Sequence, residues 1–185
     1  MEVGDARWDD FGDVTQTYYD LYEEVQERPD LGIALLSPRP TLGQEAVWFA
    51  TLLKEVEDGN RVAAVPRVDG KAVGLCEVHQ KGRSPEVAHL GELGILIGRR
   101  HRGQGIGRAL LKYTLERCRG RFRSVVLSVF VVNEPARHLY RSLGFRPWGT
   151  LPRAVLRGGR FYDEEHMVVD LEPPASPGPI GGSPF

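Results

Sequence analysis

Residues 92–111 have the sequence ELGILIGRRHRGQGIGRALL, in which an apolar run leads into a glycine-rich turn and then into a second apolar pattern. The apolar run predicts a β-strand, and the second pattern predicts a helix from about Gln104 to Cys118. The first turn of a helix leaves backbone N–H groups without partners, and together with the helix dipole these groups favour an anion. Gly103, Gly105 and Gly107 lack the side chains that would keep a phosphate at a distance. This turn is therefore a predicted phosphate-binding site.

Arginines give the turn a local positive charge in a chain whose net charge is only −1: Arg99, Arg100, Arg102 and Arg108. On its own the glycine pattern has a second interpretation, because the same spacing can cap a helix or let it pack closely against a strand. Two other phosphate-binding motifs do not match. The loop of nucleoside triphosphatases ends in Gly-Lys-Ser/Thr, and the dinucleotide fingerprint requires Gly-x-Gly-x-x-Gly in a first strand-helix unit.

The spacing Arg102-x-x-Gly105-x-Gly107 resembles the signature Gln/Arg-x-x-Gly-x-Gly/Ala of the GCN5-related N-acetyltransferase (GNAT) superfamily. A second segment, Asn133–Phe145, is similar to the family pattern Asn-x-x-Ala-x-x-x-Tyr-x-x-x-Gly-Phe. The resemblance covers about residues 72–171, whereas the N-terminal third fits only loosely, as it does across the family. Two motifs separated by one strand and one helix together indicate the GNAT fold.

The resemblance implies acetyl-CoA as the co-substrate. In the family, amides of the glycine turn bind its pyrophosphate, and main-chain groups of the preceding strand pair with its pantetheine arm. Asn133 is expected to contact the cofactor, to cap the helix that follows it, or both. The implied cofactor-binding residues are Leu96, Ile97, Arg102, Gly103, Gln104, Gly105, Ile106, Gly107, Arg108 and Asn133.

Transfer of an acetyl group from a thioester to an amine needs a neutral amine, a donor to the developing oxyanion and a proton for the departing thiolate. By resemblance, the phenol of Tyr140 is the general acid, although a tyrosine at helical spacing with Ala136 and Leu143 also fits core packing. Glu92 is the implied general base, because phosphinothricin-type acetyltransferases, which this strand resembles, carry a glutamate at that position. The other interpretation of Glu92 is an exposed charge at a strand end.

The strands 91–97 and 124–132 are expected to splay apart and to present backbone amides to the thioester carbonyl, with Gly94 as a bulge that opens the gap. No metal site is expected, because the histidines are scattered and lack ligand spacing. The acidic run at 162–167 could attract a cationic amine, but a solvated charge run is the commoner explanation.

Helices are predicted where apolar residues recur at helical spacing: Val14–Glu27, Leu42–Val56 and Glu134–Leu143. Strands are predicted in apolar, β-branched runs: 61–66, 72–78, 89–98, 125–132, 145–156 and 161–171. This order predicts an α/β (α+β), GNAT-like fold: a mixed, largely antiparallel sheet of about seven strands, with one parallel strand-helix-strand unit and helices on both faces. One domain is expected over 1–171, followed by a flexible Pro/Gly-rich tail at 172–185.

The charge balance, 24 basic against 25 acidic residues, gives no overall field that would attract nucleic acid or an anionic membrane. Two cysteines are too few for a disulfide framework or a zinc site, which favours a reduced, cytoplasmic setting. The N-terminus is acidic and no apolar run is long enough to span a bilayer, so neither secretion nor membrane insertion is expected. The oligomeric state is left open, with a homodimer among the alternatives.

The sequence therefore predicts an enzyme that moves the acetyl group of acetyl-CoA directly to a primary amine: a small amine, an amino acid, a protein N-terminus or a lysine. The alternative is a non-catalytic acyl-CoA-binding sensor or regulatory module. Retention of Tyr140 and Glu92 favours the enzyme. A nucleic-acid-binding domain that uses the arginines is disfavoured by the near-neutral charge. The acceptor is not identified, because the first two helices and the last hairpin, which would form its pocket, carry no diagnostic motif.

Overall fold

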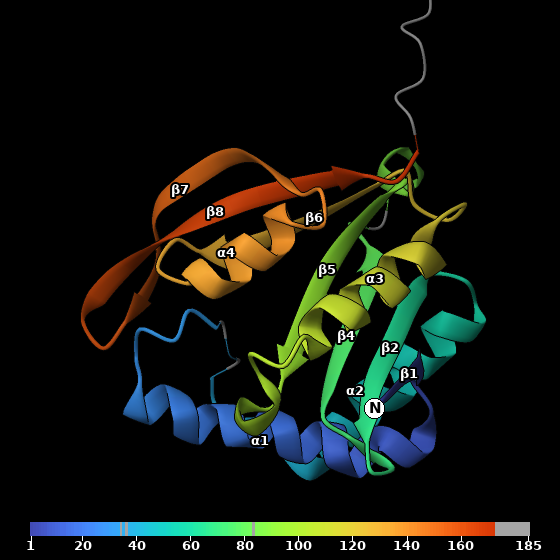
Figure 1. Cartoon of the computed structure of the whole chain (residues 1–185), viewed down its shortest axis with the longest axis horizontal. Helices are drawn as coiled ribbons and strands as arrows, with labels where there is room; N and C mark the ends of the chain where they lie inside the picture. The colour runs from blue at the N-terminus through green and yellow to red at the C-terminus, as the bar shows by residue number, and fades with distance from the viewer. Residues whose placement is uncertain (34, 36, 83, 173–185) are drawn as a thin grey trace, which may run out of the picture.

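A twisted eight-stranded sheet runs through the middle of the protein (Figure 1). The computed structural model describes residues 1–172 except 34, 36 and 83. The strand order is β1-β2-β4-β5-β6-β8-β7, with β3 paired to β2, and only the β5–β6 pair is parallel among the described strands. The strands are β1 Glu2–Asp5, β2 Arg61–Val68, β3 Lys71–Ala72, β4 Gly74–Gln80, β5 Leu90–Ile97, β6 Ser124–Phe130, β7 Arg146–Arg157 and β8 Arg160–Asp170.

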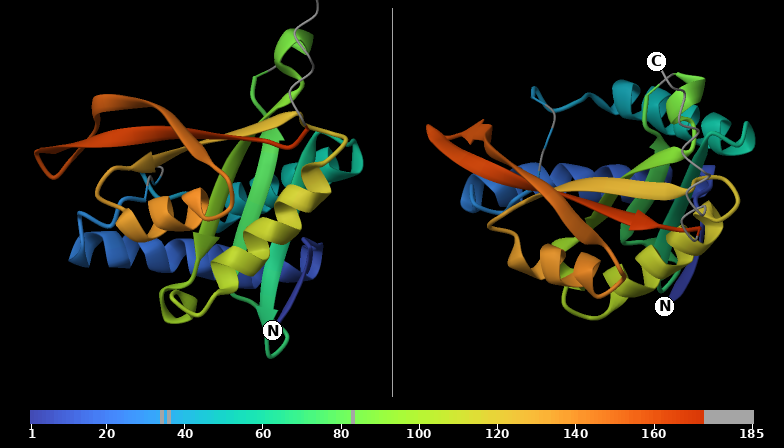
Figure 2. Two further views of the ribbon diagram at one scale, coloured as in Figure 1. Left: turned by 45° about the horizontal axis from the view of Figure 1, so that its top comes forward. Right: turned by 90° about the horizontal axis from the view of Figure 1, so that it is seen from above.

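Helices cover both faces of this sheet (Figure 2). They are α1 Phe11–Glu27, α2 Leu42–Glu57, α3 Ile106–Cys118 and α4 Glu134–Arg141. Successive side chains of a strand point to opposite faces. Along β2, Ala63 and Val65 accordingly pack in a core with residues of α1 and α2, whereas Val62 and Ala64 pack in a second core with residues of α3. No helix in the described part of the chain is long and apolar enough to cross a bilayer.

The parallel strands β5 and β6 are paired at one end only. Their register consists of Leu90 with Ser124, Gly91 with Val125 and Glu92 with Val126. Beyond these pairs the strands diverge, and β6 continues beside β8 while β5 continues beside β4 (Figure 1). The second half of β5 therefore has an edge that β6 does not cover. The expected splay between these strands is confirmed.

The predicted helices and strands are confirmed, with ends that lie within three residues of the observed ones. The short β1 was not predicted, because its four residues carry a carboxylate at each end and show no run of apolar positions. The bulge expected at Gly94 is wrong: Gly94 pairs with Glu77 in an unbroken register between β4 and β5. The expected tail lies almost entirely outside the described residues.

Candidate active site

The glycine turn between β5 and α3 has the backbone geometry of an anion site. Gly103 and Gly105 have φ values of 73° and 81°, in the left-handed region that side chains disfavour. The first amide of α3 with a backbone acceptor is that of Ala109, which donates to the carbonyl of Gly105 at 3.1 Å. The amides of residues 103–108 donate to no acceptor among the described residues. Six consecutive N–H groups are thus without an acceptor in the described part of the chain, which is typical of an anion site at the start of a helix.

The arginines around this turn divide into engaged and free side chains. Arg102 donates to both carboxylate oxygens of the buried Glu24, at 2.7 and 2.8 Å, and to the carbonyl of Ile97 at 2.8 Å. Its guanidinium therefore ties the turn to α1. Arg99 likewise pairs with Glu27 at 2.7 Å. Arg100 and Arg108 are exposed and have no ion pair with any described residue, so they supply the available positive charge.

All of the implied cofactor-binding residues except Asn133 lie between the end of β5 and the first turn of α3. Leu96 and Ile97 are its last two residues and pair with Leu75 and Gly74 of β4. The remaining turn residues, 102–108, follow within one loop and the first turn of α3. The structure thus brings together the strand edge and the free amides, as the resemblance implies.

Tyr140 lies in α4 and faces the core shared with α3. It is 7% exposed, and its ring makes an edge contact with Phe145 at 5.7 Å. Its hydroxyl makes no hydrogen bond to a described residue, yet the hydroxyl is not sealed from solvent. Among the described residues, Nε of Arg61 is the only side-chain polar atom that is both fully enclosed and without a partner. Burial raises the pKa of Tyr140, followed by a smaller effect of Cys76, so the phenol is protonated at neutral pH.

Asn133 occupies the start of α4. Its side-chain oxygen accepts a hydrogen bond from the amide of Ala136 at 3.3 Å, and its amide donates to the carbonyl of Gly32 at 3.3 Å. The predicted capping role is confirmed. Contact with the cofactor remains a prediction.

A buried carboxylate on β8 holds α4 in place. Glu165 accepts hydrogen bonds from Arg137 at 2.8 and 3.2 Å and from Arg141 at 3.1 Å. The bond from Arg137 is the main reason that the pKa of Glu165 is lowered. The expectation that the acidic run at 162–167 is solvated is wrong for Glu165, which is 6% exposed. The network fixes the helix that carries Tyr140.

Glu92 lies where the pairing of β5 with β6 ends. It pairs with Val126 of β6 and with His79 of β4, and its carboxylate is 3.3 Å from the ammonium of Lys81. Its side chain is 40% exposed. Glu92 is not among the residues that line the pocket described next, although Gly94, two residues further along the strand, is.

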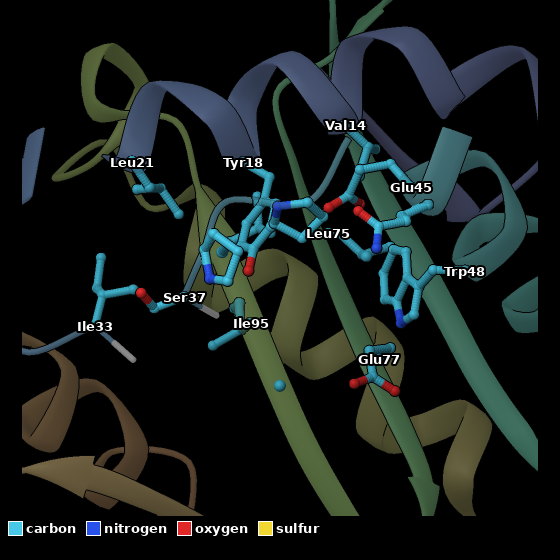
Figure 3. Close-up of a pocket in the computed structure, with 15 residues that line it drawn as sticks. Val14, Tyr18, Leu21, Ile33, Ser37, Glu45, Trp48, Leu75, Glu77 and Ile95 are labelled. Atoms are coloured by element: carbon cyan, nitrogen blue, oxygen red, sulfur yellow. The ribbon is translucent and has the colours of Figure 1, made fainter. Parts of the chain in front are cut away.

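A pocket of about 630 Å³ lies between the sheet and the two N-terminal helices (Figure 3). Its volume is within the range of sites for small molecules. The wall is mainly apolar and includes two aromatic rings, Tyr18 of α1 and Trp48 of α2. Its other described residues are Val14, Leu21, Ile33, Ser37, Pro38, Pro40, Gln44, Glu45, Leu75, Glu77, Gly94, Ile95 and Leu96.

Two carboxylates in this pocket were not predicted from the sequence. Glu77 of β4 is 3.2 Å from Arg61 and 3.1 Å from His79. Gly94 leaves room for it, since a Cβ at Gly94 would lie 3.1 Å from its carboxylate. Glu45 of α2 is 6% exposed. A signal for Glu45 was present, because it shares a helical face with Phe49 and Leu52 at i+4 and i+7.

An uncovered strand edge that leads into a run of free amides suits a ligand with an extended arm and a phosphate group, bound where the two strands diverge. The family model described as "Acetyltransferase (GNAT) family" matches residues 15–145. The chain therefore belongs to the GNAT acetyltransferase family and is an acetyl-CoA-dependent N-acetyltransferase.

Two curated relatives bear names that specify acceptors. The L-amino acid N-acetyltransferase AaaT of Escherichia coli is 28% identical over 153 residues, which are 81% of this chain and 90% of that protein. The phosphinothricin N-acetyltransferase of Streptomyces viridochromogenes is 31% identical over 87 residues, 46% of this chain and 48% of that protein. The acceptors in these names are those of the two relatives.

Two solved structures share the fold. The yncA protein of Salmonella typhimurium, solved with its cofactor acetyl-CoA, has a TM-score of 0.79 at 19% identity and covers 96% of this chain and 98% of that one. The phosphinothricin acetyltransferase Pat of Sinorhizobium meliloti, in complex with acetyl-CoA, has a TM-score of 0.75 at 23% identity and covers 91% and 87%. Acetyl-CoA fits the residues present here, because the amides of 103–108 match a pyrophosphate and the β5 edge is open.

Proposed function

We propose that the protein transfers the acetyl group of acetyl-CoA directly to a primary amine held in the pocket between α1, α2 and the sheet. One observation carries this proposal: Gly94, Ile95 and Leu96 line that pocket and also belong to the part of β5 that β6 leaves uncovered. A donor bound along the strand edge and an acceptor bound in the pocket would therefore meet across these three residues.

When bound, acetyl-CoA supplies a thioester carbonyl as the electrophile and a thiolate as the leaving group. The amine nitrogen forms a bond to the carbonyl carbon, the carbon–sulfur bond breaks, and the products are an amide and a thiol. Beyond Glu92, the backbone amides of β5 that point away from β4 lack a partner in β6 and are available to the carbonyl oxygen. Donors fixed in a strand stabilise the developing charge without reorganising.

Tyr140 is proposed as the general acid that protonates the leaving sulfur. Its phenol is held in the core on α4, protonated, and has no competing hydrogen bond to a described residue. Burial raises the pKa of the phenol and would raise that of a thiolate at the same place, so the two pKa values shift in the same direction. Replacing Tyr140 with phenylalanine would keep the ring and remove only the hydroxyl that serves as the acid.

The Tyr140→Phe variant should have a kcat lower by roughly tenfold to a thousandfold, the range typical of a lost general acid. Release of free thiol from acetyl-CoA in the presence of a panel of amines measures it. Tyr113→Phe is the matched control, because the Tyr113 hydroxyl donates to Asp5 at 3.0 Å outside the proposed machinery. Undiminished turnover of Tyr140→Phe would reduce Tyr140 to a packing residue.

Glu92 is proposed as the general base, which accepts the amine proton through a water molecule. Its position two residues before Gly94 and its ion pair with Lys81 keep a carboxylate charge near the open end of the strand pair. The Glu92→Gln variant should lose most activity near neutral pH and regain part of it at high pH, where more of the amine is already neutral. Full activity of this variant at every pH would refute the role. Lys81→Gln, which removes only the ion pair, is the control.

A further inference from the structure

The pocket has an unusual charge for a site that would accept an amino acid. Its described lining residues include two glutamates and no arginine, lysine or histidine. A free amino acid brings a carboxylate next to its amine. In this pocket that carboxylate would face Glu45 and Glu77 with no lining cation to balance it, and burying an unpaired charge is costly.

Glu45 is the carboxylate that lacks a partner. It is 6% exposed, and no hydrogen bond or ion pair joins its side chain to a described residue. Its oxygens are nevertheless open to the pocket, since neither is a fully enclosed atom without a partner. Figure 3 shows the side chain entering the pocket from α2, beside Trp48. Buried carboxylates are normally paired, so this one is arranged for a cation that comes from outside the chain.

The position of Glu45 is fixed by a well-formed helix start. Thr41 caps α2 and forms a reciprocal pair with Gln44, with the Thr41 amide 2.8 Å from the Gln44 side-chain oxygen. Glu45 follows directly in the first turn, where the helix dipole favours a negative charge. Burial nevertheless raises its pKa.

Glu77 differs from Glu45 in having its charge shared. It is within salt-bridge distance of both Arg61 and His79, and its side chain is 15% exposed. Glu77 therefore lines the pocket beside Gly94 with a carboxylate whose charge is partly balanced, whereas the charge of Glu45 is unbalanced. The rest of the wall is apolar and aromatic, which suits a hydrophobic body.

We propose that the acceptor is a hydrophobic primary amine without a carboxylate group, whose positive charge is balanced by Glu45 on entry. This inference rests on the proposed function and specifies its substrate class. It separates this chain from relatives whose names specify L-amino acids.

Arg39 is the cation near the pocket that could bind the carboxylate of an amino acid substrate. It lies in the loop between Pro38 and Pro40, which both line the pocket, but it is itself exposed and stacks 4.5 Å over the ring of Tyr19. To bind a substrate carboxylate it would have to leave that ring. The Arg39→Ala variant should therefore bind amines as the wild type does.

The first test compares phenethylamine with L-phenylalanine, two probes that differ only in the α-carboxylate. Titration calorimetry of each into the protein saturated with coenzyme A measures binding without requiring turnover. Phenethylamine should bind at least about tenfold more tightly, as expected when a buried carboxylate would face like charges. Equal or tighter binding of L-phenylalanine would overturn the inference, and loss of that binding in Arg39→Ala would identify the cation responsible.

The second test removes the charge of Glu45 while keeping its shape. Glu45→Gln should weaken phenethylamine binding by about tenfold to a hundredfold, the range of a lost charge-assisted hydrogen bond. Glu57→Gln, an exposed glutamate of the same helix, should leave it unchanged. Both variants should bind coenzyme A as the wild type does, which shows that they are folded. Unchanged phenethylamine binding by Glu45→Gln would contradict the inference.

The two proposals fail in distinguishable ways. If phenethylamine binds through Glu45 but no thiol is released from acetyl-CoA with any amine, the transfer reaction is refuted and the cation site stands. If thiol is released with L-phenylalanine more efficiently than with phenethylamine, the transfer reaction stands and the substrate class is refuted.

Discussion

At the scale of single residues, similar glutamates acquire different properties from their neighbours. Glu165 has two arginine partners, Glu77 shares its charge with an arginine and a histidine, and Glu45 has no ion pair among the described residues. The pKa of Glu165 is lowered and that of Glu45 is raised. The arginine partners lie 16 to 28 residues away in the sequence, so the composition of each local segment could not have predicted these differences.

His79 should contribute to stability in a pH-dependent way. Its ring is 3.1 Å from Glu77, and that hydrogen bond raises the pKa of the imidazole above its ordinary value. A pKa raised in the folded state stabilises the protein fully below the unfolded pKa of about 6.5, and the contribution is lost as the pH rises through the folded pKa. His79→Gln should therefore destabilise the protein more at pH 6 than at pH 9.

Urea unfolding of the wild type and His79→Gln at several pH values measures this difference in the free energy of unfolding. The same comparison in a Glu77→Gln background is the control, because the partner that raises the pKa is then absent. A loss of stability that is equal at both pH values would show that the ion pair contributes nothing.

At the scale of elements, the glycine turn shows what local sequence can and cannot determine. The spacing of its glycines predicted the start of α3 to within two residues and the free amides of its first turn. The engagement of Arg102 was not predicted, because its partner Glu24 is 78 residues away on α1. The local pattern therefore predicted the free amides of the turn but assigned it two arginines, Arg99 and Arg102, whose charge is already balanced.

Gly105→Glu should abolish binding of acetyl-CoA measured by calorimetry, because it adds a negative side chain beside the free amides and strains a backbone with φ of 81°. Gly120→Glu is a closely matched control. Gly120 has φ of 75° and, like Gly105, nothing within 4 Å of an added Cβ, but it follows the other end of α3. Both variants should lose a similar amount of stability, of roughly 1–2 kcal/mol. Undiminished binding by Gly105→Glu would remove the anion site from the proposal.

At the scale of the whole molecule, the sequence predicted the order of elements, the two helical layers and the splayed parallel pair. These features follow from periodicity and from two motifs that resemble one family. The pocket proposed for the acceptor was expected between the first two helices and the last hairpin, but its described lining residues come from α1, α2, the loop between them, β4 and β5. The hairpin's part was wrong, and the contribution of β4 and β5 was not predicted, because most of the lining residues are the same apolar types that fill the core. In the sequence, only the position of Glu45 on an otherwise apolar helical face indicated that this face of α2 lines a pocket and does not simply pack in the core.

The one-sided attachment of β5 to β6 also limits the direct strand pairing between the two parts of the proposed site. Three residue pairs join the half of the sheet that leads into the glycine turn to the half that Glu165 fastens to α4 and Tyr140. Glu92 and Val126 form the last of these pairs, at the point where the two strands separate. A bulkier side chain at Val126 would therefore change the distance between Tyr140, the proposed proton donor, and the sulfur, and so slow the chemical step, while leaving every residue proposed to hold the cofactor's phosphates unchanged.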